Sequence, residues 1–249
     1  TISNDEQYQW ISIAGTTSST SRIPSTELSD KNRWQNHNDT LKDGISKDLD
    51  IMEKYCERGG DISPGYCDSY YVVNDLSRWQ ILNTIRKCAI KNKGGGFSEM
   101  NIYYSGFGEK NTGNWCFNDG TISLKEILDQ IEEVNYFKKD KIYQIKIFSD
   151  CSYSGNWADD LRKYNDLRKP DIKYIYIHTA CHSGHRAWDT KDGGMYTRYH
   201  FGGGKEVSHC IAEIADGQYK LNEVTPDEEE NKNEIKEAED GDKFILIAG

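Results

Sequence analysis

The 249-residue sequence has no apolar run that approaches the roughly 18 to 20 residues of a membrane-spanning helix, so it predicts no transmembrane segment. No charged stretch followed by an apolar one opens the chain, as it would in a secretory signal. The first residue is Thr rather than Met, which we interpret as a trimmed N-terminus. The sequence therefore leaves the organelle undetermined.

Large aliphatic side chains are also scarce. Leu, Ile, Val and Phe together supply about 19% of the residues, close to the roughly 20% below which chains tend toward disorder. The 16 Tyr and 6 Trp residues add large, partly apolar groups that are sufficient to complete a core. The length fits one α/β domain, and we predict a single domain over residues 1–249.

Basic residues are in the minority, and the formal net charge is −10. This balance argues against a nucleic-acid partner, which would normally require a basic patch. Residues 226–243 hold nine acids and three lysines, so most of the excess lies in one segment of an otherwise nearly neutral chain. The segment lacks the spacing of a calcium-binding loop, so a solvated acidic loop is favoured over a Ca²⁺ site or a site for a basic partner. We predict no cofactor.

The cysteines form no CxxC pair and are scattered. Their number is odd, which argues against a disulfide framework and for an intracellular, reducing compartment. Three of them fall on the apolar faces of predicted helices, where we expect buried, free thiols: Cys56, Cys88 and Cys210.

Short runs rich in Ile and Tyr predict strands, several of them too continuously apolar to have a solvated face. They cover residues 8–14, 69–73, 100–104, 143–149, 173–179 and 243–248. Between them, apolar residues repeat every three or four positions and predict helices over 39–56, 75–92 and 123–137, with shorter ones at 156–167 and 204–214. Ser123 and Glu126 have the spacing of a capping box. Alternating strands and helices predict an α/β fold with a mainly parallel sheet of about six strands, a polar loop at 15–38 and an acidic inserted loop at about 215–242.

Two strand ends carry unusual small-residue turns: MNIYYSGFG at 100–108 and IKIFSDCSYSGNW at 145–157. In a parallel sheet these turns meet at the carboxyl edge, where ligand sites form. The two motifs resemble those of the caspase and metacaspase family of cysteine peptidases. That family has a strand ending in YYSGHG, whose His is the general base, and a later strand ending in D-[CS]-C-x-S-G, whose Cys is the nucleophile. GGMYT at 193–197 is similar to the family's G-x-[FY]-T segment. The resemblance implies a three-layer α/β/α sandwich.

At the two catalytic positions of that family this chain has Phe107 and Ser152. Phe accepts no proton, and a Ser hydroxyl is a weak nucleophile without a base beside it. The resemblance therefore implies a catalytically inactive domain that acts as a structural or binding module, with protein partners and a place in a larger assembly. Ser152 also fits an engineered Cys→Ser change, but Phe107 favours natural loss. A regulatory partner of an active paralogue is a further hypothesis.

The rival hypothesis is a cysteine endopeptidase that cleaves after Lys or Arg with a displaced nucleophile. Cys151 and Cys181 are the candidates. Cys151 lies one position before Ser152 on an extended segment, so its side chain is expected on the opposite face of the sheet. Cys181 follows the strand at 173–179, too far along the chain for the family's spacing, but at an end that would border the substrate cleft.

Acids near these turns are the candidate binding residues. Asp150 matches an acid that lines a pocket for Lys or Arg in metacaspases, and it equally fits a simple cap of the following helix. Asp39 is a looser match to a second pocket acid. The basic side chain of a bound peptide is the corresponding ligand. His178, Cys181, His182 and His185 are all metal-ligand types, but their spacing matches no standard zinc pattern, and we predict no metal.

Overall fold

The computed structural model describes residues 10–15, 44–56, 69–72, 77–92, 99–117, 119–167, 171–190, 192–226 and 244–246. The predictions for Asp39, most of the polar loop at 15–38 and the acidic residues 227–243 lie outside this set, as does one of the seven cysteines, Cys67.

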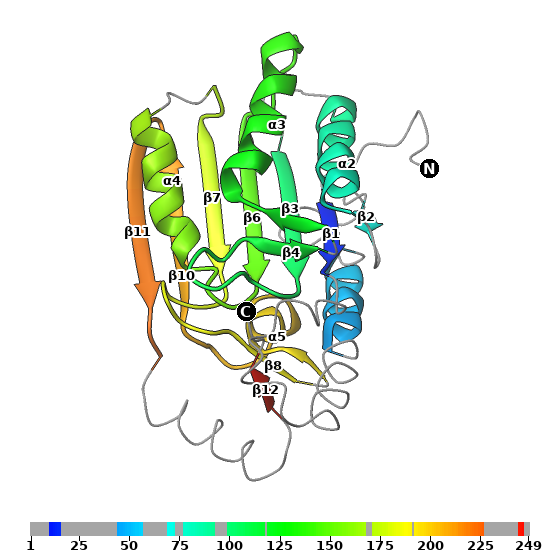
Figure 1. Ribbon diagram of the computed structural model, residues 1–249, viewed down its shortest axis with the longest axis vertical. Helices are drawn as coiled ribbons and strands as arrows, with labels where there is room; N and C mark the ends of the chain where they lie inside the picture. Colours follow the sequence, from blue (N-terminus) through cyan, green and yellow to red (C-terminus); the bar gives the residue numbers. More distant parts are fainter. Residues whose placement is uncertain are drawn as a thin grey trace.

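The centre of the structure is a seven-stranded sheet with the order β11-β10-β7-β6-β3-β1-β2 (Figure 1). Five strands are parallel: β1 (Trp10–Ala14), β2 (Ser69–Val72), β3 (Glu99–Ser105), β6 (Gln144–Asp150) and β7 (Tyr174–Thr179). Two antiparallel strands complete one edge: β10 (His209–Ala215) and β11 (Gln218–Val224). The α/β class with a mainly parallel sheet is confirmed.

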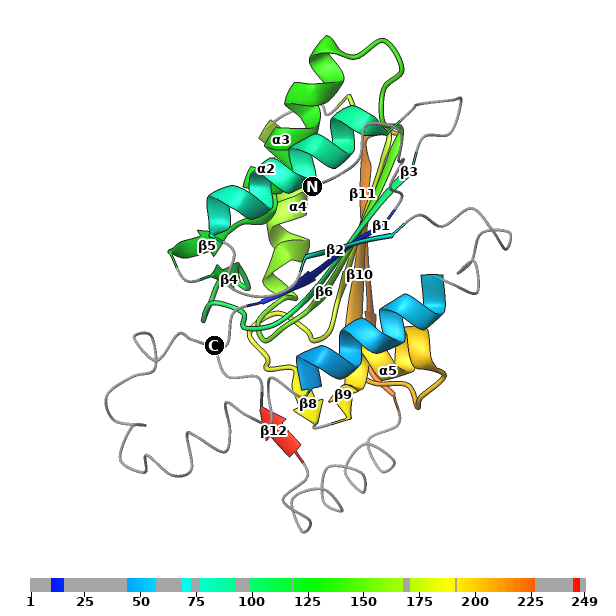
Figure 2. The ribbon, with the colours of Figure 1, turned by 90° about the vertical axis from the view of Figure 1, so that its right-hand side faces the viewer.

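Helices cover both faces of this sheet and make a three-layer α/β/α sandwich. Figure 2 shows α2 (Arg78–Lys91), α3 (Leu124–Phe137) and α4 (Asn156–Leu167) on one face. A helix over residues 44–56 and α5 (Met195–Gly202) lie on the other. The larger core fills the first interface with Ile, Leu and Trp side chains. The second interface is aromatic, with Trp10 stacked on Phe148 at 5.5 Å between ring centroids.

The strands at the centre of the sheet are buried on both faces. All five residues of β1 are buried, as are the last six of β3. β3 and β6 pair in parallel from Glu99 opposite Gln144 to Ser105 opposite Asp150. The two motif-bearing strands therefore end side by side, as predicted.

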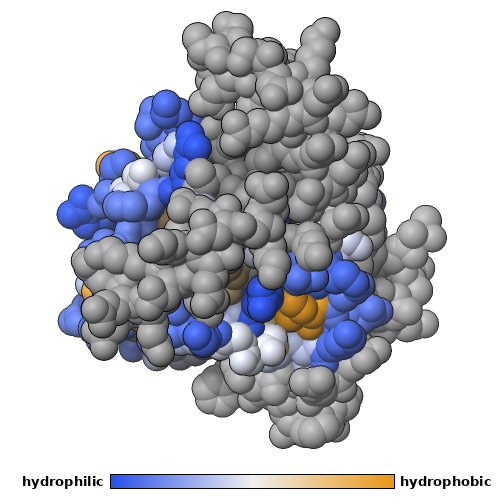
Figure 3. All heavy atoms as spheres, turned by 90° about the horizontal axis from the view of Figure 1, so that it is seen from below, coloured by the Kyte–Doolittle hydropathy of each residue, from blue (hydrophilic) through white to orange (hydrophobic). Residues whose placement is uncertain are grey.

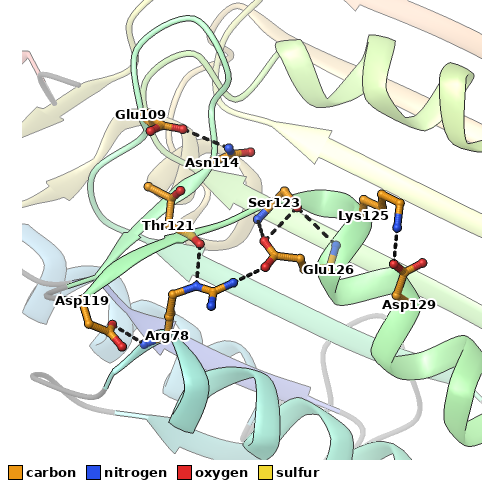
Figure 4. Close-up of polar contacts among 9 residues, drawn as sticks. All are labelled: Arg78, Glu109, Asn114, Asp119, Thr121, Ser123, Lys125, Glu126 and Asp129. Carbon is orange, nitrogen blue, oxygen red and sulfur yellow. Dashed lines mark hydrogen bonds and ion pairs between the residues drawn. The ribbon is translucent and has the colours of Figure 1, made fainter.

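Two helices of the first layer, α2 and α3, begin with capping boxes. Ser123 and Glu126 form the predicted box at α3, and Ser77 with Gln80 forms one at α2. Glu126 also pairs with Arg78 of α2. Figure 4 shows that Arg78 reaches further, with Nε donating to the Thr121 carbonyl at 3.0 Å. Thr121 lies in the hairpin of β4 (Trp115–Phe117) and β5 (Gly120–Ile122), so one guanidinium ties three elements together.

The prediction of a helix at 204–214 is wrong, because residues 209–215 form strand β10. The buried residues alternate with half-buried ones (Cys210, Ala212 and Ile214), and period two belongs to a strand. Cys210 is therefore on a strand rather than a helix face. The predicted loop at about 215–242 is wrong over its first part, which forms β11. Asp216 and Gly217 both have positive φ and make the two-residue turn typical of a hairpin.

A second, small sheet was not predicted from the sequence. It contains β12 (Phe244–Leu246), β8 (Trp188–Thr190) and β9 (Gly193–Gly194), in that order. The strand expected at 243–248 thus pairs with β8 and does not extend the main sheet. Among the helices of the described residues, none combines the length and the apolar character required to cross a bilayer.

The double role of Glu126 gives a test of the first layer. Replacing Glu126 with Ala removes both its capping bond and the ion pair with Arg78, and we expect a loss of roughly 1 to 2 kcal/mol in the free energy of unfolding. The matched control is Lys125→Ala. Lys125 is exposed and pairs with Asp129 one turn later, so its loss should stay within about 0.5 kcal/mol. Chemical denaturation measures both; equal losses would contradict the linking role of Glu126.

Candidate functional site

The two motif turns are in direct contact at the carboxyl edge of the sheet. The Gly106 amide donates to the Asp150 carbonyl at 3.2 Å. A Cβ at Gly108 would lie 1.9 Å from the Ser152 carbonyl oxygen, so only glycine permits this approach. The expected proximity of the turns that carry Phe107 and Ser152 is therefore observed. Figure 3 views the molecule from this end, where the described surface is mostly hydrophilic with a small hydrophobic area.

Phe107 belongs to an apolar cluster at this edge. Its side chain is 6% exposed and packs with Ile45, Cys181, Ala187 and other apolar residues. Its carbonyl accepts the Tyr104 hydroxyl at 2.8 Å and the Cys116 amide at 3.1 Å. The ring fills space and has no atom that accepts a proton.

Ser152 is fully buried in the turn after β6. Its hydroxyl oxygen accepts a hydrogen bond from the Ala187 amide at 3.1 Å. The next residue, Tyr153, has φ 62° and donates its amide to the His185 carbonyl at 2.7 Å. The segment that follows β7 therefore packs directly onto the turn and encloses the hydroxyl.

Cys151 points into the larger core, away from Phe107, as alternation predicted. It is fully buried, with Sγ 3.4 Å from the Ser149 hydroxyl. Burial raises the pKa of this thiol well above its ordinary value, which opposes formation of a thiolate.

Cys181 lies on the Phe107 side, in the apolar cluster. Its Sγ is 3.2 Å from the His185 carbonyl and 3.5 Å from the Ser154 hydroxyl. Burial raises the pKa of this thiol too, and its hydrogen bonds with described residues include no imidazole nitrogen. The six cysteines that the structure describes are all buried and unbridged, which confirms the expectation for Cys56, Cys88 and Cys210.

Three buried carboxyl groups converge beside these turns. They come from the helix at 44–56, the end of β6 and β8: Asp48, Asp150 and Asp189. Each is at most 1% exposed. The glycines at 193–194 leave room for them: a Cβ at Gly194 would lie 2.3 Å from Oδ2 of Asp150 and 3.2 Å from Oδ2 of Asp48.

Hydrogen bonds hold one side of this carboxyl cluster. Asp48 accepts the Ser105 hydroxyl and the Gly194 amide, both at 2.7 Å. Asp150 accepts the amide and the hydroxyl of Thr197, at 3.2 and 2.6 Å, through Oδ2. Thr197 closes the GGMYT segment, so the third motif from the sequence does converge on the other two.

The other side of the cluster is unpaired. Oδ1 of Asp150, Oδ2 of Asp189 and the Tyr196 hydroxyl are buried with no hydrogen-bond partner in the described parts of the chain. Burial raises the pKa of Asp150 to about 6. Burial, followed by repulsion from Asp150, raises the pKa of Asp48 well above its ordinary value, and burial with repulsion from both neighbours does the same to Asp189. The positive charge of Arg198 acts in the opposite direction on Asp48. Strongly shifted pKa values in a buried cluster mark a candidate functional site.

Sequence reasoning found Asp150 but missed Asp48 and Asp189, and Asp39 lies outside the described residues. A signal for Asp48 was present. It falls on the apolar side of its helix, between Ile45 and Met52, where a charged residue has no reason to be unless it has a specific partner. Asp189 gave no comparable signal, because its burial depends on the small sheet.

The four residues of metal-ligand type between positions 178 and 185 do not converge on one point. His178 packs among aromatic rings, 4.7 Å from Phe148, where burial lowers its pKa to about 3. His182 and His185 lie together near Cys181, with ring centroids 6.0 Å apart. Over the described residues, no group of three or more His, Cys, Asp or Glu side chains is arranged to hold a metal ion.

No protein-family model matches this chain, and no curated protein matches it.

The raised pKa of Asp150 predicts how stability depends on pH. Between about pH 4 and 6 the folded state keeps a proton that the unfolded state releases, so the free energy of unfolding falls as pH rises through this window. A shift of about two units corresponds to roughly 3 kcal/mol. Asp150→Asn keeps the acceptor for Thr197 and removes the charge, so the variant should lose much of this pH dependence and be more stable than the wild type at pH 8.

Urea denaturation from pH 4 to 8 measures the difference between the two proteins at each pH. The control is Asp159→Asn, an exposed acid of α4 that pairs with Arg162. Parallel profiles for the wild type and Asp150→Asn would contradict the raised pKa.

Proposed function

We propose that this chain is a caspase-like domain without peptidase activity that binds a basic side chain, Lys or Arg, of a protein partner. The observation that carries the proposal is the carboxyl cluster with its unpaired oxygens, next to turns whose catalytic positions hold Phe107 and Ser152. The three motifs that resemble the caspase and metacaspase family meet at this same edge.

The absence of catalysis is supported by the surroundings of the two positions. The Ser152 hydroxyl accepts a hydrogen bond from the Ala187 amide, and the Phe107 ring, which accepts no proton, is packed among apolar side chains. A nucleophilic hydroxyl needs a neighbouring base to lose its proton. A Phe at position 107 cannot be that base. We therefore expect the two turns to keep the backbone arrangement of a catalytic site but not the activity.

Recognition of a basic group is supported by electrostatics. Burial raises the pKa of all three carboxyl groups above the ordinary value, and repulsion between them adds to this rise at Asp48 and Asp189. An ammonium or guanidinium group between them would lower those pKa values and supply donors to the unpaired Asp150 and Asp189 oxygens. A buried charge is stabilised only when it is paired and fully hydrogen-bonded, which makes such a site selective for a cation of the right shape.

The rival activity rests on Cys181, because this thiol borders a cavity at the same edge. It predicts cleavage after Lys or Arg. The raised pKa of the thiol and its hydrogen bonds to carbonyl oxygens disfavour that role.

Activity measurements distinguish the two. The purified chain should not cleave Lys- or Arg-ended peptide substrates, with or without Ca²⁺. Ser152→Cys alone should remain inactive because the base is still missing; a positioned base is typically worth about 10² to 10⁴ in rate. The double variant Ser152→Cys/Phe107→His is expected to show cleavage, and Ser152→Cys/Phe107→Asn is its matched polar control. Cleavage by the unmodified chain that is abolished by Cys181→Ala or Cys151→Ala would establish the rival.

Binding measurements test the basic-group site directly. A peptide with a central Arg should bind at least about tenfold more tightly than the same peptide with citrulline, which keeps the shape and loses the charge. Asp150→Asn and Asp48→Asn should each remove this preference, whereas Asp159→Asn should leave it. Calorimetric titration gives the affinities. Equal affinity for both peptides would refute the assignment of the carboxyl cluster without bearing on the activity measurements.

A further inference from the structure

A cavity of about 270 Å³ lies beside the apolar cluster and apart from the three carboxyl groups. Its walls come from the segment after β7, the start of α5, the approach to β10 and the residue after β11. Two lining residues adjoin the carboxyl cluster: Trp188 precedes Asp189 in β8, and Tyr196 is close enough for Asp150 to affect it. Burial raises the pKa of the Tyr196 hydroxyl, and Asp150 raises it further. The volume is close to the lower limit for small-molecule pockets, about 300 Å³.

The cavity is lined by a positively charged residue, whereas the chain as a whole has a net negative charge. The protein has 41 acidic residues against 31 basic ones, yet the cavity walls within the described residues include no Asp or Glu. Arg186, His182 and His185 line it instead. A concave, partly apolar site with charge of one sign attracts ligands of the other sign.

The guanidinium of Arg186 has N–H donors that no described residue accepts from. Its Nε donates to the Tyr153 hydroxyl at 3.2 Å, and it has no ion pair with any acid in the described parts of the chain. A guanidinium carries five N–H groups in a planar fork that fits a carboxylate through two parallel hydrogen bonds. The bond to Tyr153 fixes the base of the side chain and leaves the terminal nitrogens for a ligand.

The two imidazoles are oriented by backbone carbonyls. Nε2 of His182 donates to the Val224 carbonyl and Nδ1 of His185 donates to the Ser183 carbonyl, both at 2.9 Å. These bonds assign the proton of each neutral ring, because a carbonyl only accepts.

The rest of the wall is apolar, with Ala180, Met195 and Val207 among its residues. We propose that this cavity binds a carboxylate carried on a short apolar stem, of the size of a glutamate side chain, with Arg186 as its principal contact. This site goes beyond the basic-group site and is independent of it, because it uses none of the three carboxyl residues.

Two sources of such a carboxylate are distinguished by experiment. One is a separate ligand, such as a small acid or an acidic residue of a peptide. The other is the chain itself, since acidic residues 227–230 follow directly in sequence after Thr225, which lines the cavity, and Pro226.

The probe is N-acetylglutamate, and its neutral isostere N-acetylglutamine is the matched control ligand. Each is titrated into isotopically labelled protein while the amide resonances of Ala187 and Val207 are followed. We expect saturable shifts with the acid and at least tenfold weaker binding of the amide. Arg186→Gln should abolish the preference for the acid. Tyr153→Phe, which keeps the guanidinium and loses its hydrogen bond, should bind within a few-fold of wild type.

Arg162→Gln, the same charge change on the exposed face of α4, should leave the affinity unchanged. The quadruple variant Asp227→Asn/Glu228→Gln/Glu229→Gln/Glu230→Gln separates the two sources. A several-fold gain in affinity for added N-acetylglutamate identifies the chain's own acids as competitors, and unchanged affinity assigns the cavity to a separate ligand. The proposal is overturned if neither the wild type nor this quadruple variant distinguishes the acid from the amide, or if Arg186→Gln retains the preference.

Discussion

The candidate site depends on one backbone contact, the approach of Gly108 to the carbonyl of Ser152. It exists because β3 and β6 are adjacent and parallel, so their carboxyl ends emerge together, and because a glycine stands where any side chain would collide. The contact involves neither the Phe107 ring nor the Ser152 hydroxyl. The frame of the site is therefore independent of the side chains at positions 107 and 152.

In the carboxyl cluster, by contrast, the side chains themselves matter, because burying three acids together destabilises the folded state. Asp48, Asp150 and Asp189 are buried close together, and each holds its proton more tightly than it would in water. Two glycines and a threonine of one short segment surround them, which indicates a position shaped around these acids. Natural folds accept local destabilisation mainly where a binding partner compensates it, and this balance is the physical basis of the proposed cation site.

Strong local patterns made most of the fold predictable. The buried parallel strands are continuously apolar, and the capping box at Ser123 is a local signal that tertiary contacts reinforce. β10 was misread because Ile211 is apolar as well as Cys210, Ala212 and Ile214, so both a helical and an alternating period fit the segment. The Asp216–Gly217 pair marks the hairpin and settles the choice. Asp150 was accessible through its motif, whereas Asp189 and the cavity depend on how distant segments pack, which no local pattern encodes.

The order of the sheet has a consequence for how the chain assembles. β1 and β2 pair with each other, and every later strand of the main sheet adds to an edge that earlier residues have already made: β3 on β1, then β6, β7, β10 and β11 in turn. No strand of the main sheet has to be inserted between two that are already paired, because β3 adds to the edge of β1 that β2 leaves free. A chain emerging from the ribosome can therefore extend its sheet in the order of synthesis, with the antiparallel hairpin of β10 and β11 closing the growing edge last.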